Sequence, residues 1–287
     1  MSTVRALLLS SRPLSWVNTA YPFAVAYLLV HGGIDLAWAI GTIYFLVPYN
    51  LAMYGINDVF DYESDLRNPR KGGVEGALLD RRFHRTTLWA VVVTNVPFLV
   101  ALVALGSALS WVVLAVSVFA VIAYSAPVLR FKERPFLDSL TSSTHFVSPA
   151  VYGLALAGGS FDATAWLVLG AFFLWGMASH AFGAVQDIIA DREGGIGSIA
   201  TVIGAAPTVK LSVLLYVAAG VLLAFAGPPA AWAGLLALPY AVSILPWWSV
   251  READAEGANR GWKRFLWLNY VTGALVTMLI IGIVTFG

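Results

Sequence analysis

The residues from Asn57 to Asp65 place one amide and four carboxylates directly after an apolar run. On a helix, which turns about 100° per residue, the spacing i, i+4 and i+8 brings Asn57, Asp61 and Asp65 onto one arc, with Asp58 beside Asp61. Carboxylate and amide oxygens suit Mg²⁺, which keeps several waters and shares the rest of its shell with substrate phosphates. The spacing therefore predicts a metal site on one helix face.

A second pair of carboxylates, Asp187 and Asp191, repeats the i, i+4 spacing after another apolar run. Two acidic faces repel each other, so the pattern predicts a cation between them. Guanidinium groups suit phosphate oxygens, and basic residues follow both the first acidic cluster and a later apolar run. These residue types together predict a metal–diphosphate site. Its expected diphosphate ligands are Arg67, Arg70, Lys71, Arg130 and Lys132.

Most other charged residues are explained by solvation at a membrane surface, including those at positions 81–85 and 251–264. His145 and His180 lie within apolar runs. A lone histidine there is more often a hydrogen-bonded interior residue than a ligand. Neither is therefore assigned to the predicted site.

The elements that position these residues are predicted to be membrane helices. The chain has 287 residues, of which 59% are hydrophobic and only 11% are charged, with no cysteine. A soluble domain is about 25% charged, so lipid is the expected solvent. Disulfides, thiolate chemistry and cysteine-bound metals are excluded. The basic N-terminal residues are interpreted as the start of the first membrane helix, not as a removed signal.

Nine segments approach the length of about 20 apolar residues that a membrane helix needs. The predicted fold is therefore all-α and polytopic, with one domain over residues 1–287. The nine segments are Leu14–Val30, Ala37–Ile56, Thr86–Leu105, Trp111–Tyr124, Ser139–Ala157, Ala165–Val185, Val209–Ala226, Ala231–Val250 and Phe265–Phe286.

The distribution of positive charge predicts the orientation. Sixteen of the 17 Lys and Arg residues lie before the first segment or in the loops that follow the even-numbered segments, and the other, Lys210, is the second residue of the seventh segment, next to such a loop. The positive-inside rule makes that side cytoplasmic. The N-terminus is then cytoplasmic, the C-terminus is outside, and both acidic pairs lie on the cytoplasmic side.

Three motifs resemble those of the UbiA-type membrane prenyltransferases. They are Asn57-Asp-x-x-Asp61-x-x-x-Asp65 followed by Arg67-Asn68-Pro69-Arg70, then Tyr124-Ser-Ala-Pro-Val-Leu-Arg130-Phe-Lys132, then Asp187-x-x-x-Asp191. The resemblance covers the whole chain and implies nine helices with two cytoplasmic helical caps. It adds Asn68 as a diphosphate ligand and Tyr124 as a catalytic residue. One departure is Gly183, where many members have Asp or Asn, which thins the second cluster.

Other stretches are similar to the lycopene elongases of bacteria that make C50 carotenoids. They are residues 10–22, 48–65, 132–136, 142–146 and 267–270. This similarity implies an enzyme of the bacterial plasma membrane that transfers dimethylallyl from dimethylallyl diphosphate to the ends of lycopene, taking C40 to C45 to C50. Mg²⁺ is the implied cofactor, and a downstream carotenoid cyclase is a candidate partner. Nucleic acid is not an expected partner.

In the implied mechanism, Asn57, Asp58, Asp61, Asp65, Asp187 and Asp191 bind Mg²⁺, and the four aspartates 61, 65, 187 and 191 act in catalysis. The allylic C–O bond ionises, and a terminal double bond of the acceptor attacks the cation. Two alternatives stay open. An aromatic-acceptor prenyltransferase of quinone or chlorophyll biosynthesis would share every aspartate, and a non-enzymatic transporter would share the membrane helices.

Overall fold

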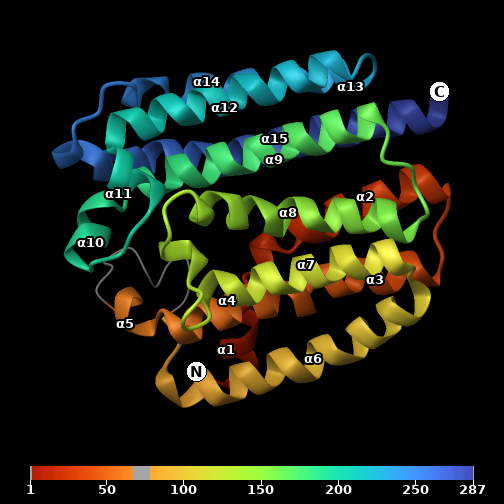
Figure 1. The fold of residues 1–287 in the computed structure, drawn as a ribbon, viewed down its shortest axis with the longest axis horizontal. Coiled ribbons are helices and arrows are strands. Elements are labelled where there is room, and N and C mark those ends of the chain that lie inside the picture. Colours follow the sequence, from red (N-terminus) through yellow and green to blue (C-terminus); the bar gives the residue numbers. More distant parts are fainter. Residues whose placement is uncertain (1, 67–77, 287) are drawn as a thin grey trace. The chain divides into compact units, whose positions relative to one another are not determined.

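The computed structural model describes residues 2–66 and 78–286, and every regular element in these ranges is a helix (Figure 1). The predicted all-α class is therefore confirmed for the described part of the chain. The fold divides into two compact units. The first comprises Met1–Phe131 and Thr144–Ser160, and the second comprises Lys132–Ser143 and Phe161–Gly287. The assignment of one functional domain to residues 1–287 stays a prediction.

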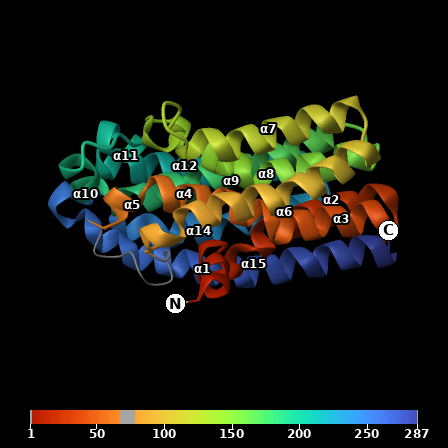
Figure 2. The same cartoon turned by 90° about the horizontal axis from the view of Figure 1, so that it is seen from below.

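The first unit contains the N-terminal helices, with 3₁₀ turns at Pro13–Ser15 and Arg81–Phe83. Helices α2, α3, α6 and α7 run along a common direction (Figure 2). The α-helices are α1 (Thr3–Ser10), α2 (Val17–His31), α3 (Leu36–Leu46), α4 (Pro48–Phe60), α5 (Tyr62–Asp65), α6 (His84–Leu105), α7 (Ala108–Ser125) and the later part of α8 (Leu137–Leu156).

The second unit contains the start of α8 and all later helices, with 3₁₀ turns at Leu245–Trp247 and Glu252–Ala258. A further 3₁₀ turn, Phe131–Glu133, lies where the two units divide. Helices α9, α12 and α14 run side by side (Figure 1). The α-helices are α9 (Ala163–Val185), α10 (Ile188–Glu193), α11 (Ile199–Ile203), α12 (Ala205–Phe225), α13 (Ala230–Gly234), α14 (Ala237–Ile244) and α15 (Asn259–Phe286).

Local sequence explains where several helices begin and end. The side chains of Asp35 and Asp162 each accept a hydrogen bond of 2.8 Å from a backbone N–H in the first turn of α3 and α9. Such N-caps satisfy donors that the helix itself cannot pair. Helix α2 ends at Gly32, whose φ of 76° is costly for residues with a Cβ.

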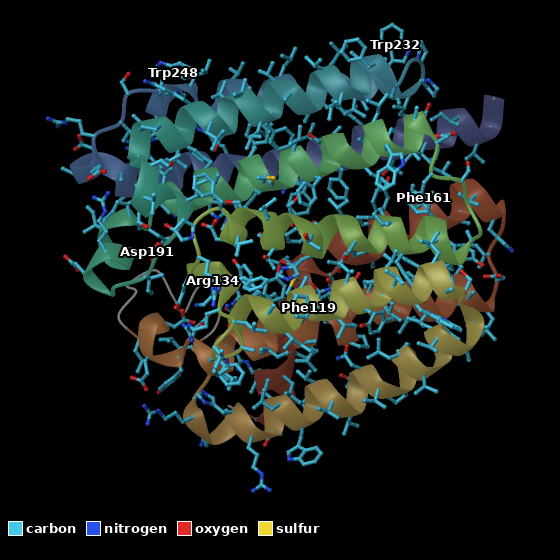
Figure 3. All side chains as sticks on the ribbon, in the orientation of Figure 1. Phe119, Arg134, Phe161, Asp191, Trp232 and Trp248 are labelled. Carbon is cyan, nitrogen blue, oxygen red and sulfur yellow. The ribbon has the colours of Figure 1, made fainter. Side chains whose placement is uncertain are left out.

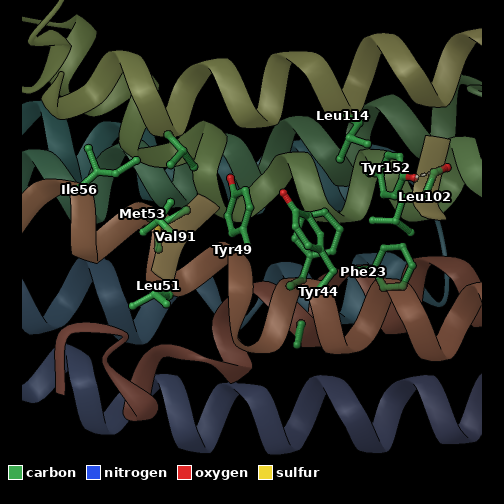
Figure 4. Close-up of a cluster of buried hydrophobic side chains, with 14 of the residues drawn as sticks. Phe23, Tyr44, Tyr49, Leu51, Met53, Ile56, Val91, Leu102, Leu114 and Tyr152 are labelled. Atoms are coloured by element: carbon green, nitrogen blue, oxygen red, sulfur yellow. Dashed lines mark hydrogen bonds between the residues drawn. The ribbon is translucent and has the colours of Figure 1, made fainter. Parts of the chain in front are cut away.

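Aromatic side chains form the core of the first unit (Figure 4). Phe23 of α2 packs against the rings of Phe45 and Tyr152, with centroid distances of 5.3 and 5.9 Å. Tyr44 and Tyr49 pack edge to face at 5.9 Å. Such arrangements add to the stabilisation from burial because ring edges and faces carry opposite partial charge. This core fixes α2, α3, α4 and α8 against one another.

The second unit has its own aromatic core around Tyr240. The ring of Tyr216 stacks on Tyr240 at 5.5 Å, and Trp175 meets Tyr240 edge to face at 5.7 Å. Phe265 of α15 closes the group, 5.8 Å from Tyr240. These contacts join α9, α12, α14 and α15.

Seven helical stretches of the described residues are long and apolar enough to cross a membrane, so the chain is an integral membrane protein, as predicted. The predicted count of nine is not confirmed. Helix α2 has only 15 residues, and α8 has 20 but carries a polar run from Asp138 to His145. The seven stretches are Leu36–Phe60, Arg81–Leu105, Ala108–Ser125, Ala163–Val185, Ala205–Phe225, Ala230–Trp247 and Glu252–Thr285.

Exposed tryptophans mark the two ends of one such stretch in the second unit. Trp232 and Trp248 lie at opposite ends of the segment formed by α13 and α14 (Figure 3). Both side chains are exposed, at 64% and 44%. Tryptophan is enriched at both membrane–water interfaces, because its ring is apolar and its N–H is polar. The spacing fits a segment that crosses the bilayer.

Gly153 is required for the close approach of α8 to α2. A Cβ at this position would lie 2.6 Å from the backbone oxygen of Phe23 and 3.1 Å from the backbone nitrogen of Tyr27. We expect Gly153→Ala to lower the free energy of unfolding by about 1–3 kcal/mol, because backbone cannot yield as a flexible side chain can.

The measurement is thermal unfolding in detergent. The matched control is Gly273→Ala on α15, where a Cβ meets nothing within 4 Å. The control should be neutral or slightly stabilising, since alanine is the better helix former. Equal melting temperatures for the two variants would contradict the packing argument.

Candidate functional site

The end of α4 gathers the first acidic cluster. Helix α4 ends at Phe60, yet Asp65 N–H donates to the Asp61 carbonyl at 2.8 Å, so the i, i+4 register continues into α5. Asp61 and Asp65 are buried, at 3% and 8% exposure. The Asn57 amide donates to the Asp61 carboxylate and, at 3.0 Å, to Ser125 Oγ. The predicted association of Asn57 with Asp61 is therefore present in the structure.

The loop after α7 brings a cation to the same carboxylate. Arg130 Nη2 lies 3.5 Å from Asp61 Oδ1. Val128 and Arg130 have φ values of 76° and 39°, in the left-handed region that non-glycine residues rarely adopt. This tight loop turns the chain back so that residues 69 positions apart in sequence meet. The proximity of Arg130 to the acidic cluster follows from this turn.

Tyr124 is the next-to-last residue of α7, directly before that loop. Its ring meets the imidazole of His145 edge to face, with a centroid distance of 5.1 Å. Ser125, the next residue, is the buried hydroxyl that accepts from Asn57. The end of α7 therefore contributes both to the hydrogen bonds of the acidic cluster and to an aromatic contact with α8.

Asp58 points to a different partner from its neighbours. Its Oδ1 accepts from Arg12 Nη2 at 2.7 Å and its Oδ2 accepts from Ser10 Oγ at 2.8 Å. The guanidinium of Arg12 also lies over the ring of Tyr54, at 4.6 Å. Burial lowers the pKa of Arg12, but the Asp58 carboxylate and the Tyr54 phenol together raise this pKa by more than burial lowers it. The net shift is therefore upward, and Arg12 stays charged.

The Arg12–Asp58 ion pair gives the N-terminal segment a structural role that sequence reasoning missed. The positive-inside pattern explained Arg12 fully, so nothing in its type or position pointed to a partner 46 residues away. Both oxygens of Asp58 are engaged with donors of the N-terminal segment. The predicted role of Asp58 as a metal ligand therefore competes with this ion pair.

Four predicted diphosphate ligands, Arg67, Asn68, Arg70 and Lys71, lie outside the described residues. Among the described residues on either side of this gap, Glu63 forms an exposed ion pair with Arg81. Arg81 also lies over the ring of Tyr62, at 5.2 Å. Glu63 is thus engaged by Arg81 and not by the groups that contact Asp61.

The second acidic pair lies at the short helix α10 of the second unit, with Asp187 just before the helix and Asp191 within it. Asp187 is the residue before α10, and Asp191 N–H donates to the Asp187 carbonyl at 2.8 Å. The backbone carbonyl of Asp191 accepts from Ile196 N–H at 2.8 Å, which closes the loop after the helix (Figure 3). The predicted i, i+4 relation of the two carboxylates is therefore realised on one helical turn.

Close contacts between α9 and α15 fix the position at which α10 begins. The amide of Asn259 donates to Gln186 Oε1 at 2.7 Å, one residue before Asp187. A Cβ on Gly261 would lie 2.7 Å from the ring of Phe182, so only glycine permits this approach. Since Asn259 and Gly261 are neighbours on α15, both contacts restrain the same end of α9.

Gly183 has a packing explanation. A Cβ there would touch the indole of Trp262 at 3.4 Å, and any longer side chain would have to displace that ring. Trp262 is itself held by Phe265, with the rings stacked at 4.7 Å and 15°. The space that a side chain at position 183 would enter is therefore occupied by the Trp262 ring.

Lys132, another predicted diphosphate ligand, belongs to the second unit. Its ammonium lies 3.8 Å from Glu133 Oε1, and its side chain is only 14% exposed. The charge is therefore held in a largely buried position next to a carboxylate.

The donor set fits a hard divalent cation. Asn57, Asp61 and Asp65 supply only oxygen ligands in a buried position, and burial without compensation would be costly for ionised carboxylates. In the described residues, no group of three or more acidic or histidine side chains surrounds one point. Each aspartate pair can therefore supply only part of a shell, which leaves positions for water and for phosphate oxygens.

A family model described as the UbiA prenyltransferase family matches residues 19–271. A lycopene elongase/hydratase from Corynebacterium glutamicum is 58% identical over 283 residues, which cover 99% of each chain. A C(50) beta-cyclic carotenoids biosynthesis protein from Dietzia sp. is 60% identical over 273 residues, covering 95% of this chain and 63% of that protein. A lycopene elongase/hydratase from Haloferax volcanii is 33% identical, covering 93% and 86%.

Solved structures with the same fold are more distant in sequence. A UbiA homologue from Archaeoglobus fulgidus, bound to DMAPP and Mg²⁺, has a TM-score of 0.70 at 18% identity and covers 93% of this chain and 98% of that one. An apo UbiA homologue from Aeropyrum pernix has a TM-score of 0.66 at 21% identity, with coverages of 91% and 98%. Similarity at this level establishes the fold.

The Arg12–Asp58 pair generates a prediction about stability. Asp58→Asn should lower the free energy of unfolding by about 3–5 kcal/mol, because it leaves a largely buried guanidinium without its counter-charge. Arg12→Met should have a similar effect, and the double variant should lose less than the sum of the two. Thermal unfolding in detergent measures all three, with Glu63→Gln at an exposed pair as the control.

The competing role of Asp58 gives a different result in the same series. If Asp58→Asn unfolds like the wild type but binds Mn²⁺ more weakly by electron paramagnetic resonance, Asp58 is a metal ligand and the ion pair is incidental.

Proposed function

The chain belongs to the UbiA prenyltransferase family, and on that premise we propose that it transfers dimethylallyl groups from dimethylallyl diphosphate to the ends of lycopene. The observation that carries this proposal is the identity of 58% to a lycopene elongase/hydratase over 99% of both chains. Alignment over the full length includes the helices that would contact the acceptor as well as the acidic motifs. Lycopene as the acceptor is the more specific part of the proposal, because the family as a whole is defined by transfer of prenyl groups.

The donor is proposed to bind at the two aspartate pairs. Asn57, Asp61 and Asp65 would hold Mg²⁺ through oxygen atoms, and Asp187 and Asp191 are the other proposed carboxylate ligands. When bound, Mg²⁺ supplies charge stabilisation to the departing diphosphate. Proposed direct contacts of the chain to the diphosphate oxygens are Arg67, Asn68, Arg70, Lys71, Arg130 and Lys132.

Arg130 is the diphosphate ligand for which the described residues give the clearest support. Its guanidinium lies 3.5 Å from Asp61 Oδ1, longer than a well-formed charge-assisted hydrogen bond of about 2.7–2.9 Å. A guanidinium carries five N–H donors in a planar fork, a geometry that suits phosphate oxygens. Placed beside a leaving diphosphate, Arg130 stabilises the negative charge that develops as the allylic C–O bond breaks.

The bond that forms joins C1 of the dimethylallyl cation to a carbon of the terminal double bond of lycopene. This attack leaves a tertiary cation on the acceptor. Loss of a proton gives an extended alkene, and addition of water gives an extended tertiary alcohol. Two rounds, one at each end, take C40 to C45 and C50. Tyr124, with its ring held by His145, is proposed to contact the allylic group.

The proposed arrangement in the membrane is nine crossings, with helical caps and the diphosphate site on the cytoplasmic side of the bacterial plasma membrane. The location of all 17 Lys and Arg residues supports this orientation, which puts the C-terminus outside. Lycopene and dimethylallyl diphosphate then reach the protein from different phases. The acceptor arrives through lipid and the donor through water.

The first test compares acceptors. Membranes containing the protein, given dimethylallyl diphosphate and Mg²⁺, should add one and then two C5 units to lycopene, as seen by mass spectrometry. A hydroxybenzoate or a naphthoate should gain no C5 unit. Prenylation of the aromatic acids without any C45 or C50 product would favour the aromatic-acceptor alternative, and absence of any transfer would favour a transporter.

The second test concerns the acidic cluster. Asp61→Asn should lower kcat/KM for dimethylallyl diphosphate by about 100-fold or more, since it alters a proposed metal ligand that also faces Arg130. Glu63→Gln, two residues away and directed to Arg81, is the matched control and should stay within about twofold of wild type. Comparable loss in both variants would show that the cluster acts only through its overall charge.

A further inference from the structure

Helix α10 has only six residues, Ile188–Glu193, yet the arrangement of the second aspartate pair depends on it. A helix this short is not stable in water by itself, because its first turn fixes several residues for a single hydrogen bond. Contacts with the rest of the second unit must therefore keep Asp187 and Asp191 in their i, i+4 relation. The 252–259 segment, which consists of the 3₁₀ turn Glu252–Ala258 and the first residue of α15, packs against α10 and supplies two of these contacts.

The first contact holds the residue that precedes the acidic pair. Gln186 is buried and lies directly before Asp187 in the sequence. Its Oε1 accepts from the side-chain amide of Asn259 at 2.7 Å. The last residue of the 252–259 segment therefore holds the chain where α10 begins.

The second contact holds the residue that follows the acidic pair. Arg192 lies directly after Asp191, and its Nη1 donates to Glu252 Oε2 while its Nη2 donates to Glu252 Oε1 at 2.9 Å. Two bonds between one guanidinium and one carboxylate fix the mutual orientation of both groups, which a single-point ion pair at a surface does not. The first residue of the 252–259 segment therefore holds the other end of the acidic pair.

Arg192 also reaches α11, which is itself held by a buried carboxylate. Its Nη2 donates to the carbonyl of Thr201 at 3.0 Å. Asp138 at the start of α8 is fully buried, and its Oδ2 accepts from Ile199 N–H in the first turn of α11 at 2.8 Å. The Asp138 Oδ1 accepts from Ser139 N–H at the same distance. Arg192 is therefore held between the 252–259 segment and a helix of fixed position.

The two contacts enclose the acidic pair. Along α10 the held residues are Gln186 and then Arg192, and along the 252–259 segment their partners occur in the opposite order, Asn259 and then Glu252. The segment thus runs antiparallel to α10 and grips it on both sides of Asp187 and Asp191. A shift of α10 along or about its axis would break at least one of these contacts.

We propose that the 252–259 segment positions Asp187 and Asp191 for Mg²⁺, with Arg192 and Glu252 as the positioning residues at the end next to Asp191. This inference rests on the proposed function, because it takes the two aspartates as ligands of the metal. Arg192 then serves the site through the place it gives to Asp191, in contrast to the arginines proposed to bind the diphosphate.

Charge and position can be separated, because the two partners carry opposite charge. Arg192→Gln removes a positive charge near the acidic pair, and Glu252→Gln removes a negative one. If only charge mattered, the first change would tighten the binding of a divalent cation and the second would weaken it. Positioning predicts weaker binding in both variants, because either change opens the same bridge. The double variant should lose about as much as either single variant, since the bridge is lost only once.

The test is Mn²⁺ binding to the full-length protein in detergent, followed by electron paramagnetic resonance without any substrate. The Kd for Mn²⁺ should rise about three- to tenfold in Arg192→Gln and in Glu252→Gln, less than or equal to the smallest loss expected when a direct partner of a metal ligand is removed. Asp254→Asn is the matched control, because it removes the same charge from the same 3₁₀ turn but pairs with Arg251, at 2.8 Å. Its Kd should stay within about twofold of wild type.

Hydrogen exchange of the metal-free protein gives a second readout that does not depend on catalysis. The backbone amides of Ile188–Glu193 should exchange faster in Arg192→Gln and Glu252→Gln than in Asp254→Asn. Both ion-pair side chains are about half exposed, so the melting temperature of each variant should stay close to that of wild type. A general structural defect would instead speed exchange throughout the second unit.

Several results would overturn the positioning role. They are opposite shifts of the Kd in Arg192→Gln and Glu252→Gln, equal shifts in Glu252→Gln and Asp254→Asn, or an unchanged Kd in both bridge variants. Wild-type protein that binds no Mn²⁺ would instead refute the proposed metal site, and with it the donor part of the proposed function. Failure of wild-type protein to extend lycopene, with Mn²⁺ binding intact, would refute the acceptor and leave the positioning role standing.

Discussion

Burial of carboxylates at the end of a membrane helix is the constraint on which the first unit depends. Asp58, Asp61 and Asp65 are all less than a tenth exposed. An ionised carboxylate out of water must be paired or hydrogen-bonded, or it is strongly destabilising. For Asp58 the partner is Arg12 of the N-terminal segment. For Asp61 the partners are Arg130 of the loop after α7 and the nearby amide of Asn57.

The same compensation organises the surroundings of the site. Because Asp58 and Asp61 have different cationic partners, the N-terminal segment and the loop after α7 are both held against the end of α4. Asp138 has the corresponding role in the second unit, where its two oxygens bind the backbone of α8 and α11. Elsewhere in the first unit, the close approach of Gly153 to Phe23 joins α8 to α2. A cation-forming reaction benefits, since pre-oriented dipoles need not reorganise.

Recognition of donor and acceptor follows different physics in this family. A diphosphate is bound through its charge, by a few basic residues and by a metal ion held on carboxylate oxygens. A site made of so few residues can be kept while most of the chain changes. Structures at 18% identity accordingly share the fold. A polyene offers only apolar surface and shape, so its recognition is spread over many side chains. Support for the acceptor therefore comes from relatives at 58% identity over the whole length.

The sequence by itself determined the helical class, the membrane environment, the two i, i+4 acidic pairs and the family, because periodicity, composition and short motifs are local properties. It did not determine that Asp58 pairs with Arg12, that Trp262 covers Gly183, or that Glu252 holds Arg192. Each of these contacts joins residues 40 or more positions apart, on helices whose rotation about their axes is set by packing. The count of nine crossings stays a prediction, since α2 has only 15 residues and α8 carries a polar run. Hydropathy alone cannot separate a polar residue facing lipid from one hydrogen-bonded inside a bundle.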